Sequence, residues 1–351
     1  MMNEALPEWP LFGLDEDVRP ALRAASAGGR PLVLATLTAL DGGGPRPVGT
    51  QMVFGEGVVS GYFSGGCVES DVAAHAAACL EDGTPRTLVY GQGSPWPDIQ
   101  LLCGARIEIF LERVAADDPA LAELLNAQNE RRPCVWLSDG VTRRCCGPEE
   151  AATWDGAIRR DYVPSPRLAV VGADPAALAI AMLGAQSGFE TTLVRPKGPA
   201  APPPLAGVAY SRETPDVALS RLGLDPWTAV AVASHDLATD QAALLAALPS
   251  AAGYVGLLGA RARLPERLDR LRALGVEEAA IARLHAPIGL DIGGKAPWEV
   301  AVSVIGEIMA LRQARLKGRT STVSPAAAAG ASGARRSRAS APAKMLTSEE
   351  S

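Results

Sequence analysis

The chain has 351 residues, of which 48% are hydrophobic and 21% charged, and its formal net charge is −6 at pH 7. This composition is typical of a globular protein with a buried core, and the length suggests about two domains. The acidic balance argues against a nucleic-acid binder, which would carry a basic face. No apolar run is long enough to span a bilayer and the first residues do not resemble a secretory signal, so we expect a cytoplasmic protein. Its six cysteines should then be free thiols or ligands.

The first half of the chain mixes helical patterns with short apolar strands. In chain order we expect helix 15–27, strand 31–37, strands 51–54 and 58–62, helix 69–80, strands 87–90 and 106–112, helix 119–130, and a hairpin of 134–137 with 141–145. These elements predict a mixed α+β unit over residues 1–163.

After the linker Pro164-Ser165-Pro166 the pattern becomes a regular alternation of strand and helix. The expected strands are 168–171, 191–194, 229–233 and 254–258, and the expected helices are 175–187, 240–248, 265–274 and 297–315. This alternation predicts an α/β fold with a Rossmann-like doubly wound parallel sheet over residues 164–317. Residues 318–351 are rich in Ala, Ser and Pro, and we expect a disordered tail because they cannot bury apolar surface.

Two cysteines stand next to glycines in the first half of the chain. Cys67 follows Gly65-Gly66, and Cys103 precedes Gly104. Glycine lets the backbone approach a ligand closely, and a thiolate is a ligand for soft metals and a participant in sulfur transfer. Cys67 also lies just before an expected helix, whose positive end favours the thiolate. The spacing does not predict structural zinc, and we expect Cys79 and Cys134 in the core.

The first turn of the expected Rossmann unit departs from the dinucleotide fingerprint. Gly172 follows the strand, but Asp174 stands where a glycine would let the backbone approach a pyrophosphate. The next strand ends in Arg195 instead of an acidic residue for the ribose hydroxyls. These departures disfavour NAD(P) binding in the usual manner and leave open a Rossmann scaffold without that ligand.

The sequence Ser234-His235-Asp236 holds the three residue types of a hydrolase triad, but adjacent side chains do not converge as a triad must. His235 nevertheless ends an expected parallel strand, where ligands bind in open α/β sheets. A surface histidine without a ligand is the alternative.

Two further stretches of the Rossmann unit carry charged groups beside glycines. Gly259 is followed by Arg261 and Arg263, whose guanidinium groups suit phosphate or carboxylate, although a solvated helix start explains them equally well. The apolar loop 284–295 brings His285 and Asp291 close to a helix N-terminus, a position that suits an anion.

Five segments of the chain together resemble the XdhC/CoxI family of accessory proteins for molybdenum hydroxylases such as xanthine dehydrogenase. The segments are 45–52, 65–69, 102–104, 254–259 and 285–303, and the resemblance extends over residues 20–317. Ser64 replaces the first of three glycines before the cysteine, Ala105 replaces the second glycine after Cys103, and Asp174 interrupts the glycine fingerprint.

The resemblance implies a chaperone that binds the molybdenum cofactor, as molybdopterin or its dinucleotide form, in a cleft between two domains. Such a chaperone protects the cofactor, presents it to a cysteine desulfurase for sulfuration and inserts it into an apo molybdenum hydroxylase. It implies metal contacts from Cys67 and Cys103, and phosphate contacts from Arg46, Arg261 and Arg263. The other residues expected to contact the cofactor are Gly49, Gln51, Gly65, Gly66, Glu69, Gly104, Gly172, His235, Gly259, His285 and Asp291.

Two other functions remain open at this point. One is an NAD(P)-dependent oxidoreductase that uses the Rossmann-like unit, and the other is a maturation adaptor that docks the client enzyme and holds no cofactor. We expect a chaperone more than an enzyme with its own turnover, and a homodimer is compatible with either role.

Overall fold

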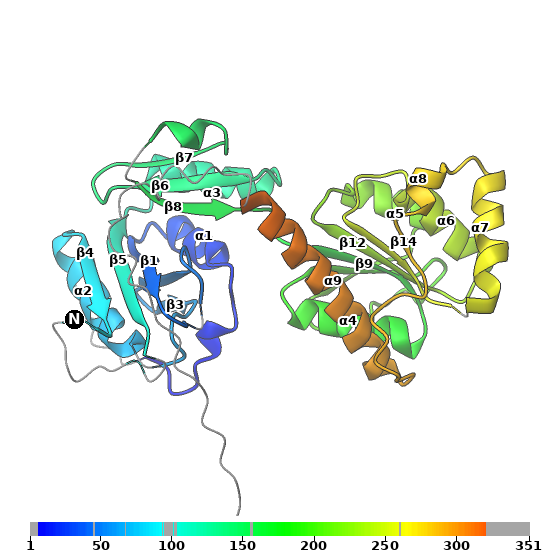
Figure 1. Ribbon diagram of the computed structural model, residues 1–351, viewed down its shortest axis with the longest axis horizontal. Helices are drawn as coiled ribbons and strands as arrows, with labels where there is room; N and C mark the ends of the chain where they lie inside the picture. The colour runs from blue at the N-terminus through cyan, green and yellow to red at the C-terminus, as the bar shows by residue number, and fades with distance from the viewer. Residues whose placement is uncertain are drawn as a thin grey trace, which may run out of the picture.

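The structure is a computed structural model that describes residues 6–44, 46–66, 68–92, 94, 101, 104–154, 157–259 and 261–320. Two α/β parts lie side by side (Figure 1). The segment 163–166 connects the N-terminal part to the Rossmann part, and the long helix α9 (Pro297–Thr320) runs from the Rossmann part towards the N-terminal part.

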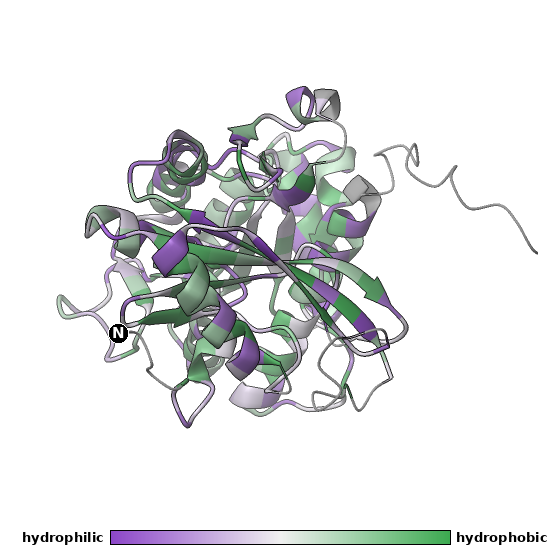
Figure 2. Cartoon of the chain, turned by 90° about the vertical axis from the view of Figure 1, so that its left-hand side faces the viewer, coloured by the Kyte–Doolittle hydropathy of each residue, from purple (hydrophilic) through white to green (hydrophobic). Residues whose placement is uncertain are grey.

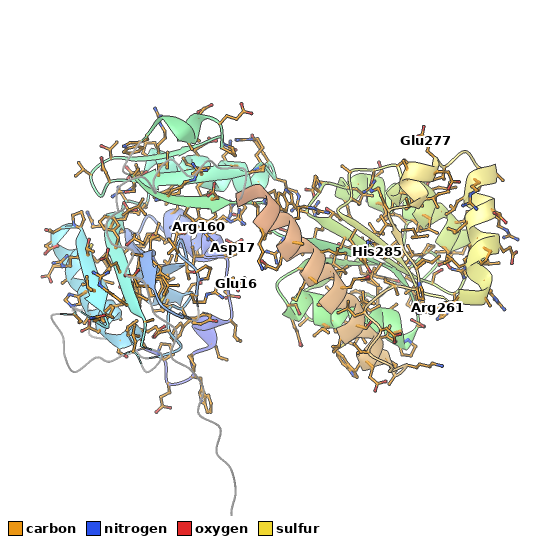
Figure 3. All side chains as sticks on the ribbon, in the orientation of Figure 1. Glu16, Asp17, Arg160, Arg261, Glu277 and His285 are labelled. Carbon is orange, nitrogen blue, oxygen red and sulfur yellow. The ribbon has the colours of Figure 1, made fainter. Side chains whose placement is uncertain are left out.

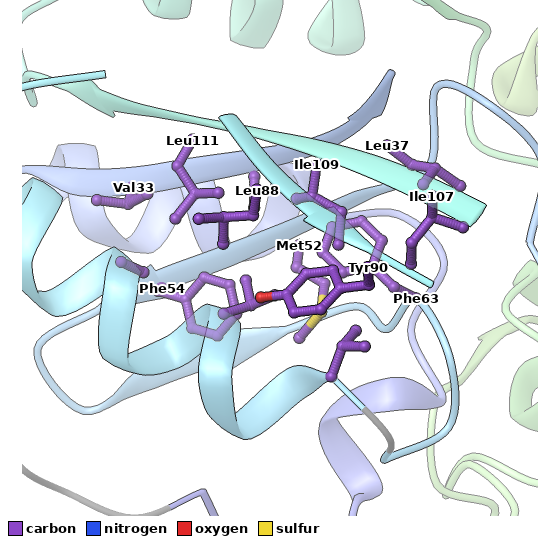
Figure 4. Packing of buried hydrophobic residues seen from close by; sticks show 14 of the residues in the cluster. Val33, Leu37, Met52, Phe54, Phe63, Leu88, Tyr90, Ile107, Ile109 and Leu111 are labelled. Atoms are coloured by element: carbon purple, nitrogen blue, oxygen red, sulfur yellow. The ribbon is translucent and has the colours of Figure 1, made fainter. Parts of the chain in front are cut away.

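The N-terminal part is built on a five-stranded antiparallel sheet in the order β3-β2-β1-β5-β4. Its strands are β1 (Leu32–Asp41), β2 (Gln51–Gly55), β3 (Val58–Ser60), β4 (Arg86–Tyr90) and β5 (Arg106–Val114). Helix α2 (Glu69–Asp82) packs on one face, over a core that includes Val33, Met52 and Ile109 (Figure 4). Both faces of β1 are buried, because Leu32 and Leu34 point into a second core on the opposite side.

That second core lies beneath two helices and a small sheet. The helices are α1 (Arg19–Ala27) and α3 (Pro119–Asn129), and the sheet β7-β6-β8 contains β6 (Cys134–Ser138), β7 (Arg143–Cys146) and β8 (Ile158–Tyr162). Figure 2 shows hydrophobic residues along the strands of this part and hydrophilic ones on the outer loops and helix faces. Cys79 and Cys134 are 0% and 1% exposed, so their expected place in the core is confirmed.

The antiparallel register brings three loops to one edge of the five-stranded sheet. Asp41 at the end of β1 pairs with Arg106 at the start of β5, and Tyr90 at the end of β4 pairs with Ile107. The end of β3 pairs in the same way with the start of β2. The loops that follow β1, β3 and β4 therefore leave from the same edge, and the latter two hold positions 67 and 103.

The Rossmann part contains a six-stranded parallel sheet in the order β11-β10-β9-β12-β13-β14, as the alternation predicts. Its strands are β9 (Arg167–Gly172), β10 (Glu190–Val194), β11 (Val208–Ser211), β12 (Thr228–Ala233), β13 (Tyr254–Leu257) and β14 (Leu284–His285). The strand order reverses between β9 and β12. That switch point is where ligands bind in open α/β sheets.

Helices cover both faces of this sheet. Helix α4 (Pro175–Gln186) and helix α9 pack on one face. The other face carries α5 (Pro215–Leu222), α6 (Leu237–Ala247), α7 (Leu264–Ala273) and α8 (Glu278–Ile281). The segment before α7 forms the short 3-10 helix η3 (Arg261–Arg263).

The structure differs from the expected elements at several places. Helix α1 begins at Arg19 instead of residue 15, because Pro20 suits only the first turn of a helix, and the segment before it forms the 3-10 helix η1 (Leu11–Gly13). Strand β8 was not expected, because its sequence Ile-Arg-Arg-Asp-Tyr lacks apolar alternation. Nor were β11, α5, α8 and β14. Helix α9 continues to Thr320, so residues 318–320 are helical instead of part of a tail.

An arginine joins the two parts of the molecule. Arg131, at the end of α3, donates from Nε to Asp225 Oδ2 at 2.6 Å and from Nη2 to Oδ1 at 3.3 Å, and it pairs with Glu190 at 3.4 Å. Burial by itself would raise the pKa of Asp225, but hydrogen bonds from Arg131 and Thr228 hold it below its usual range. The bond therefore stabilises the folded state where Asp225 is ionised.

Substitution of this arginine should weaken the fold in a pH-dependent way. We expect Arg131→Gln to lower the free energy of unfolding by about 1 kcal/mol at pH 7, because the pair is partly exposed to solvent. The difference should begin to shrink below about pH 4, where the unfolded chain protonates this carboxyl, and it should be lost as the pH falls through the lowered pKa of Asp225 in the fold. Urea unfolding at pH 7 and at about pH 3.5, below the usual carboxyl pKa, measures both. The control Arg132→Gln, which removes exposed pairs with Glu123 and Glu130, should change little. Equal losses at both pH values would contradict this assignment.

Candidate functional site

The carboxylate of Glu69 organises the loop between β3 and α2. It accepts hydrogen bonds from the backbone N–H groups of Phe63 at 2.9 Å, Ser64 at 2.6 Å, Gly65 at 3.1 Å and Gly66 at 2.8 Å. The amide of Val68 and the hydroxyl of Ser64 donate to it as well. Burial alone would raise the pKa of Glu69, but the hydrogen bonds from Ser64 and Phe63 hold it below its usual range. The loop is thus wrapped around a buried anion.

The glycines of this loop have a conformational role. Gly65 and Gly66 adopt φ of 80° and 119°, a region that L side chains rarely occupy, and their amides point at Glu69. The amides of Gly65 and Gly66 donate to the Glu69 carboxylate. Either amide, or the carboxylate, would have to break that hydrogen bond before it could contact a ligand directly. Cys67 itself lies outside the described residues, as does Cys103.

The loop between β4 and β5 packs beside the loop that follows β1. Gly104 adopts φ of 70° and donates its N–H to Leu101 O at 2.9 Å. A Cβ on Gly91 would come 2.1 Å from Ala105 O, and one on Gly42 would touch Ala105 Cα at 3.5 Å. The hydroxyl of Tyr90 donates to Asp71 of α2 at 2.6 Å. This bond ties the end of β4 to the helix that begins with Glu69.

The other expected contacts of the N-terminal part lie near the start of β2. Gln51 is 5% exposed; its amide donates to Thr36 at 3.1 Å and accepts from the Tyr162 hydroxyl, so its polar atoms hold the fold together. Arg46 lies over the Tyr62 ring at 4.8 Å from the centroid and pairs with Glu16 at 2.8 Å. Tyr62 directly precedes the loop that Glu69 organises.

At the switch point of the Rossmann sheet, Asp174 and His235 form a pair. Asp174 ends the turn after β9, and its Oδ1 accepts from Ala177 N at 2.8 Å, which caps helix α4. Its Oδ2 lies 2.7 Å from His235 Nε2, at the end of β12. A Cβ on Gly172 would come 2.4 Å from Ala233 O, so glycine is required there for close packing. A carboxylate therefore occupies the helix N-terminus where a dinucleotide would place its phosphate.

His235 has the backbone of a strained residue. Its φ is 59°, and its side chain is 61% exposed. Residues held in this region cluster at functional sites. Its neighbours have other partners, because Ser234 donates to Asp240 and Asp236 caps α6 through Thr239 N. The three adjacent residues thus do not form a triad. This absence of a triad is what the sequence predicts.

A second histidine–carboxylate pair lies at the end of β14. His285 Nδ1 is 3.1 Å from Oε1 of Glu307 in α9, and its ring stacks on Tyr254 with centroids 4.7 Å apart. Glu307 also accepts from the Tyr254 hydroxyl and from Gly289 N. Burial and the neighbouring Glu307 raise the pKa of Tyr254. Glu307 was not among the residues expected from the sequence, since nothing near it in sequence marks it as the partner of a histidine.

The remaining expected contacts lie at the carboxyl ends of β13 and β14. Gly259, Arg261, Arg263 and Asp291 are exposed, and a Cβ on Gly259 would come 3.5 Å from Nη1 of Arg267 (Figure 3 labels Arg261 and His285). Arg267, which the sequence analysis missed, forms a 2.9 Å ion pair with the buried Asp240 of α6. Arg261 and Arg267 line the same small cavity with Gly259.

Within the part of the chain that the structure describes, three or more His, Cys, Asp and Glu side chains nowhere gather in a way that would hold a metal ion. Positions 67 and 103 lie outside the described residues. The helices of the same described residues are all too short or too polar to cross a membrane.

The fold and the glycine-framed loops define a two-part protein. A cysteine-bearing α+β unit comes first in the sequence and a Rossmann unit follows it. Residues 168–308 match the family model described as the XdhC Rossmann domain, and residues 25–91 match the XdhC and CoxI family. The molybdenum cofactor insertion chaperone PaoD of Escherichia coli is 31% identical over 323 residues, which cover 87% of this chain and 95% of the relative. The chain belongs to the XdhC and CoxI family.

Two other relatives extend over most of the chain. A protein of Bacillus subtilis described as a probable xanthine dehydrogenase subunit is 25% identical over 315 residues, covering 80% of this chain and 93% of the relative. A crystal structure described as a xanthine dehydrogenase from Bacillus halodurans superposes with a TM-score of 0.68 at 24% identity. It covers 88% of this chain and 98% of that chain, and it supports the same fold.

The buried carboxylate of Glu69 should contribute to stability through its charge. We expect Glu69→Gln to lower the free energy of unfolding at pH 7 by about 2 kcal/mol, because hydrogen bonds to a charged acceptor are lost or weakened. Since the pKa of Glu69 is lowered in the fold, this contribution should disappear as the pH falls through that pKa. Urea unfolding of the variant and of Glu81→Gln, an exposed position on the same helix, tests this. Equal stability of both variants would refute the role of Glu69.

Proposed function

We propose that this protein is a chaperone for the molybdenum cofactor. It binds the cofactor, shields it, supports its sulfuration by a cysteine desulfurase, and inserts it into an apo molybdenum hydroxylase of the xanthine dehydrogenase or CO dehydrogenase type. The proposal is supported by the similarity, over 87% of this chain and 95% of the relative, to a protein named as a molybdenum cofactor insertion chaperone. We further propose that it acts in the cytoplasm.

The observation that carries the proposal is the arrangement of loops at one edge of the five-stranded sheet. Glu69 fixes the backbone on both sides of position 67, and Gly104 begins the return of the chain after position 103. Both loops leave from the same sheet edge. A pair of thiols delivered there suits a soft metal centre such as molybdenum or its exchangeable sulfur.

We assign the two parts of the chain different tasks in holding this cargo. Cys67 is the primary sulfur contact, Cys103 is its partner, and Gly65, Gly66 and Gly104 give the loops the backbone shape that they need. Residues 1–163 form the cysteine-bearing domain, and residues 164–317 form the Rossmann domain. The edge that carries His235 and His285, together with Gly259, Arg261, Arg263 and Asp291, is proposed to contact the pterin or an attached nucleotide.

Asp174 also bears on the oxidoreductase alternative. Its carboxylate caps α4 at 2.8 Å, at the position where NAD(P) would place a pyrophosphate, so two like charges would meet there. We therefore propose that the Rossmann domain does not bind NAD(P) in the usual manner. Saturable fluorescence changes on titration with NADH or NADPH would contradict this part of the proposal.

The cofactor content of the purified protein tests the function directly. We expect protein from a host that synthesises the cofactor to carry molybdenum and near-stoichiometric pterin, measured by mass spectrometry and by fluorescence after oxidation. Cys67→Ala should lose most of the pterin with nearly unchanged stability, because the thiol is the proposed metal contact. The control Cys146→Ala removes a thiol on β7 and should retain the pterin.

Two outcomes would count against this assignment. Equal pterin retention in Cys67→Ala and wild type would remove Cys67 from the site. Folded wild-type protein without pterin from a competent host would favour an adaptor that binds apoenzyme and no cofactor. Mass spectrometry of the released pterin would distinguish molybdopterin from its dinucleotide form.

A further inference from the structure

Four arginines from four elements gather where the N-terminal part meets α9. They are Arg19 of α1, Arg46 of the loop after β1, Arg160 of β8 and Arg312 of α9. The Tyr162 ring lies beneath two of them, with guanidinium carbons 5.3 Å (Arg19) and 5.6 Å (Arg160) from its centroid. Figure 3 shows Arg160, Asp17 and Glu16 on the side of the N-terminal part that faces α9. We call these four residues the arginine cluster.

Two carboxylates are paired with the arginine cluster. Asp17 accepts from Nε and Nη2 of Arg19, both at 2.8 Å, and Glu16 accepts from Arg46 at 2.8 Å. The same two carboxylates are the ones whose charges act on Arg312. The side chains of Arg160 and Arg312 make no hydrogen bond or ion pair with the described residues of the chain. Within the described residues, two arginines of the cluster thus have a paired carboxylate and two do not.

Several donors of the arginine cluster are buried without an acceptor. Arg19 Nη1, Arg46 Nε and Arg160 Nε are inaccessible to solvent and have no hydrogen-bond partner among the described residues, and the Arg19 side chain is only 5% exposed. Burial lowers the pKa of Arg312 even though Glu16 and Asp17 oppose that shift. Buried donors almost always have a partner in folded proteins. These three donors therefore lack the acceptor that buried donors usually have.

We propose that the arginine cluster binds a phosphate or pyrophosphate group of an organic ligand. Guanidinium groups are suited to this, because their planar forks match phosphate oxygens and keep their charge when buried. The inference rests on the proposed function and deepens it, since the group would be the phosphate end of the pterin cargo or its attached nucleotide. Arg46 connects the arginine cluster to the loop that Glu69 organises, because its guanidinium lies over Tyr62, the residue directly before that loop.

Occupancy of this site would also join the two parts of the molecule. Arg19, Arg46 and Arg160 belong to the N-terminal part, whereas Arg312 is on the helix that comes from the Rossmann part. An anion held by all four arginines would bridge the two parts, in addition to the direct Arg131–Asp225 bond. Ligand binding would thereby be linked to the relative position of the two parts.

Titration calorimetry of the full chain with inorganic pyrophosphate, and separately with inorganic phosphate, tests the proposal. Arg160→Gln and Arg312→Gln remove cations that form no ion pair with the described residues, so little stability should be lost, with Arg160 giving up its stacking on Tyr162. We expect each to weaken pyrophosphate binding about tenfold or more, as loss of a charge-assisted contact does. The control Arg270→Gln, which removes an exposed pair with Glu266, should bind as wild type does. Tighter binding of pyrophosphate than of phosphate would indicate a nucleotide diphosphate, and the reverse order a phosphate monoester.

No binding of either anion by wild type, or equal binding by wild type and both arginine variants, would overturn the proposal. Its failure can be told apart from failure of the proposed function. Pterin in the purified protein together with arginine-independent anion binding would refute the arginine cluster alone. Arginine-dependent pyrophosphate binding by a protein that never carries pterin would refute the chaperone function and leave the anion site standing.

Discussion

The buried carboxylate of Glu69 is the interaction on which the rest of the N-terminal site depends. A carboxylate taken out of water is costly unless hydrogen bonds replace its hydration, and here five backbone amides and a hydroxyl do so. To reach it, the chain must pass through left-handed conformations at Gly65 and Gly66. Gly65, Gly66 and Glu69 at the start of α2 therefore act together. Their hydrogen bonds fix the backbone on either side of position 67.

The Rossmann part repeats this arrangement with a different residue. Asp174 caps α4 with one oxygen and pairs with His235 through the other, so the turn that binds phosphate in dinucleotide proteins already holds an anion. In both glycine-containing turns a carboxylate of the chain itself thus accepts from backbone amides or an amide at the helix start. Recognition of an anionic ligand would then depend on side chains, such as those of the arginine cluster proposed above.

Charged groups link the two parts, whereas none of the apolar clusters formed by the described residues takes members from both. Arg131 holds Asp225 directly, and the charges of Glu16 and Asp17 act on Arg312 of α9 without an ion pair. Contacts of this kind depend on charge and water, so they respond to an anion more readily than a hydrophobic core would. A cargo held between the parts would use the same contacts that set their position.

The sequence by itself determined the elements that depend on local periodicity. The strand–helix alternation after Pro166, the burial of Cys79 and Cys134, and the place of Gly172 at the end of a strand follow from patterns within a few residues. Strand β8, with its polar sequence, lay beyond this reasoning because its position is decided by pairing with β6.

Tertiary structure alone decided which polar groups are available to a ligand. The family resemblance implies Gln51 and Glu69 as ligand contacts, but the fold buries both and gives them partners within the chain. His235 meets Asp174 across 61 residues, and the arginine cluster draws on segments from α1 to α9. The physical reason is that periodicity records which face of an element is apolar, whereas hydrogen-bond and charge partners are set by how distant strands and helices come together.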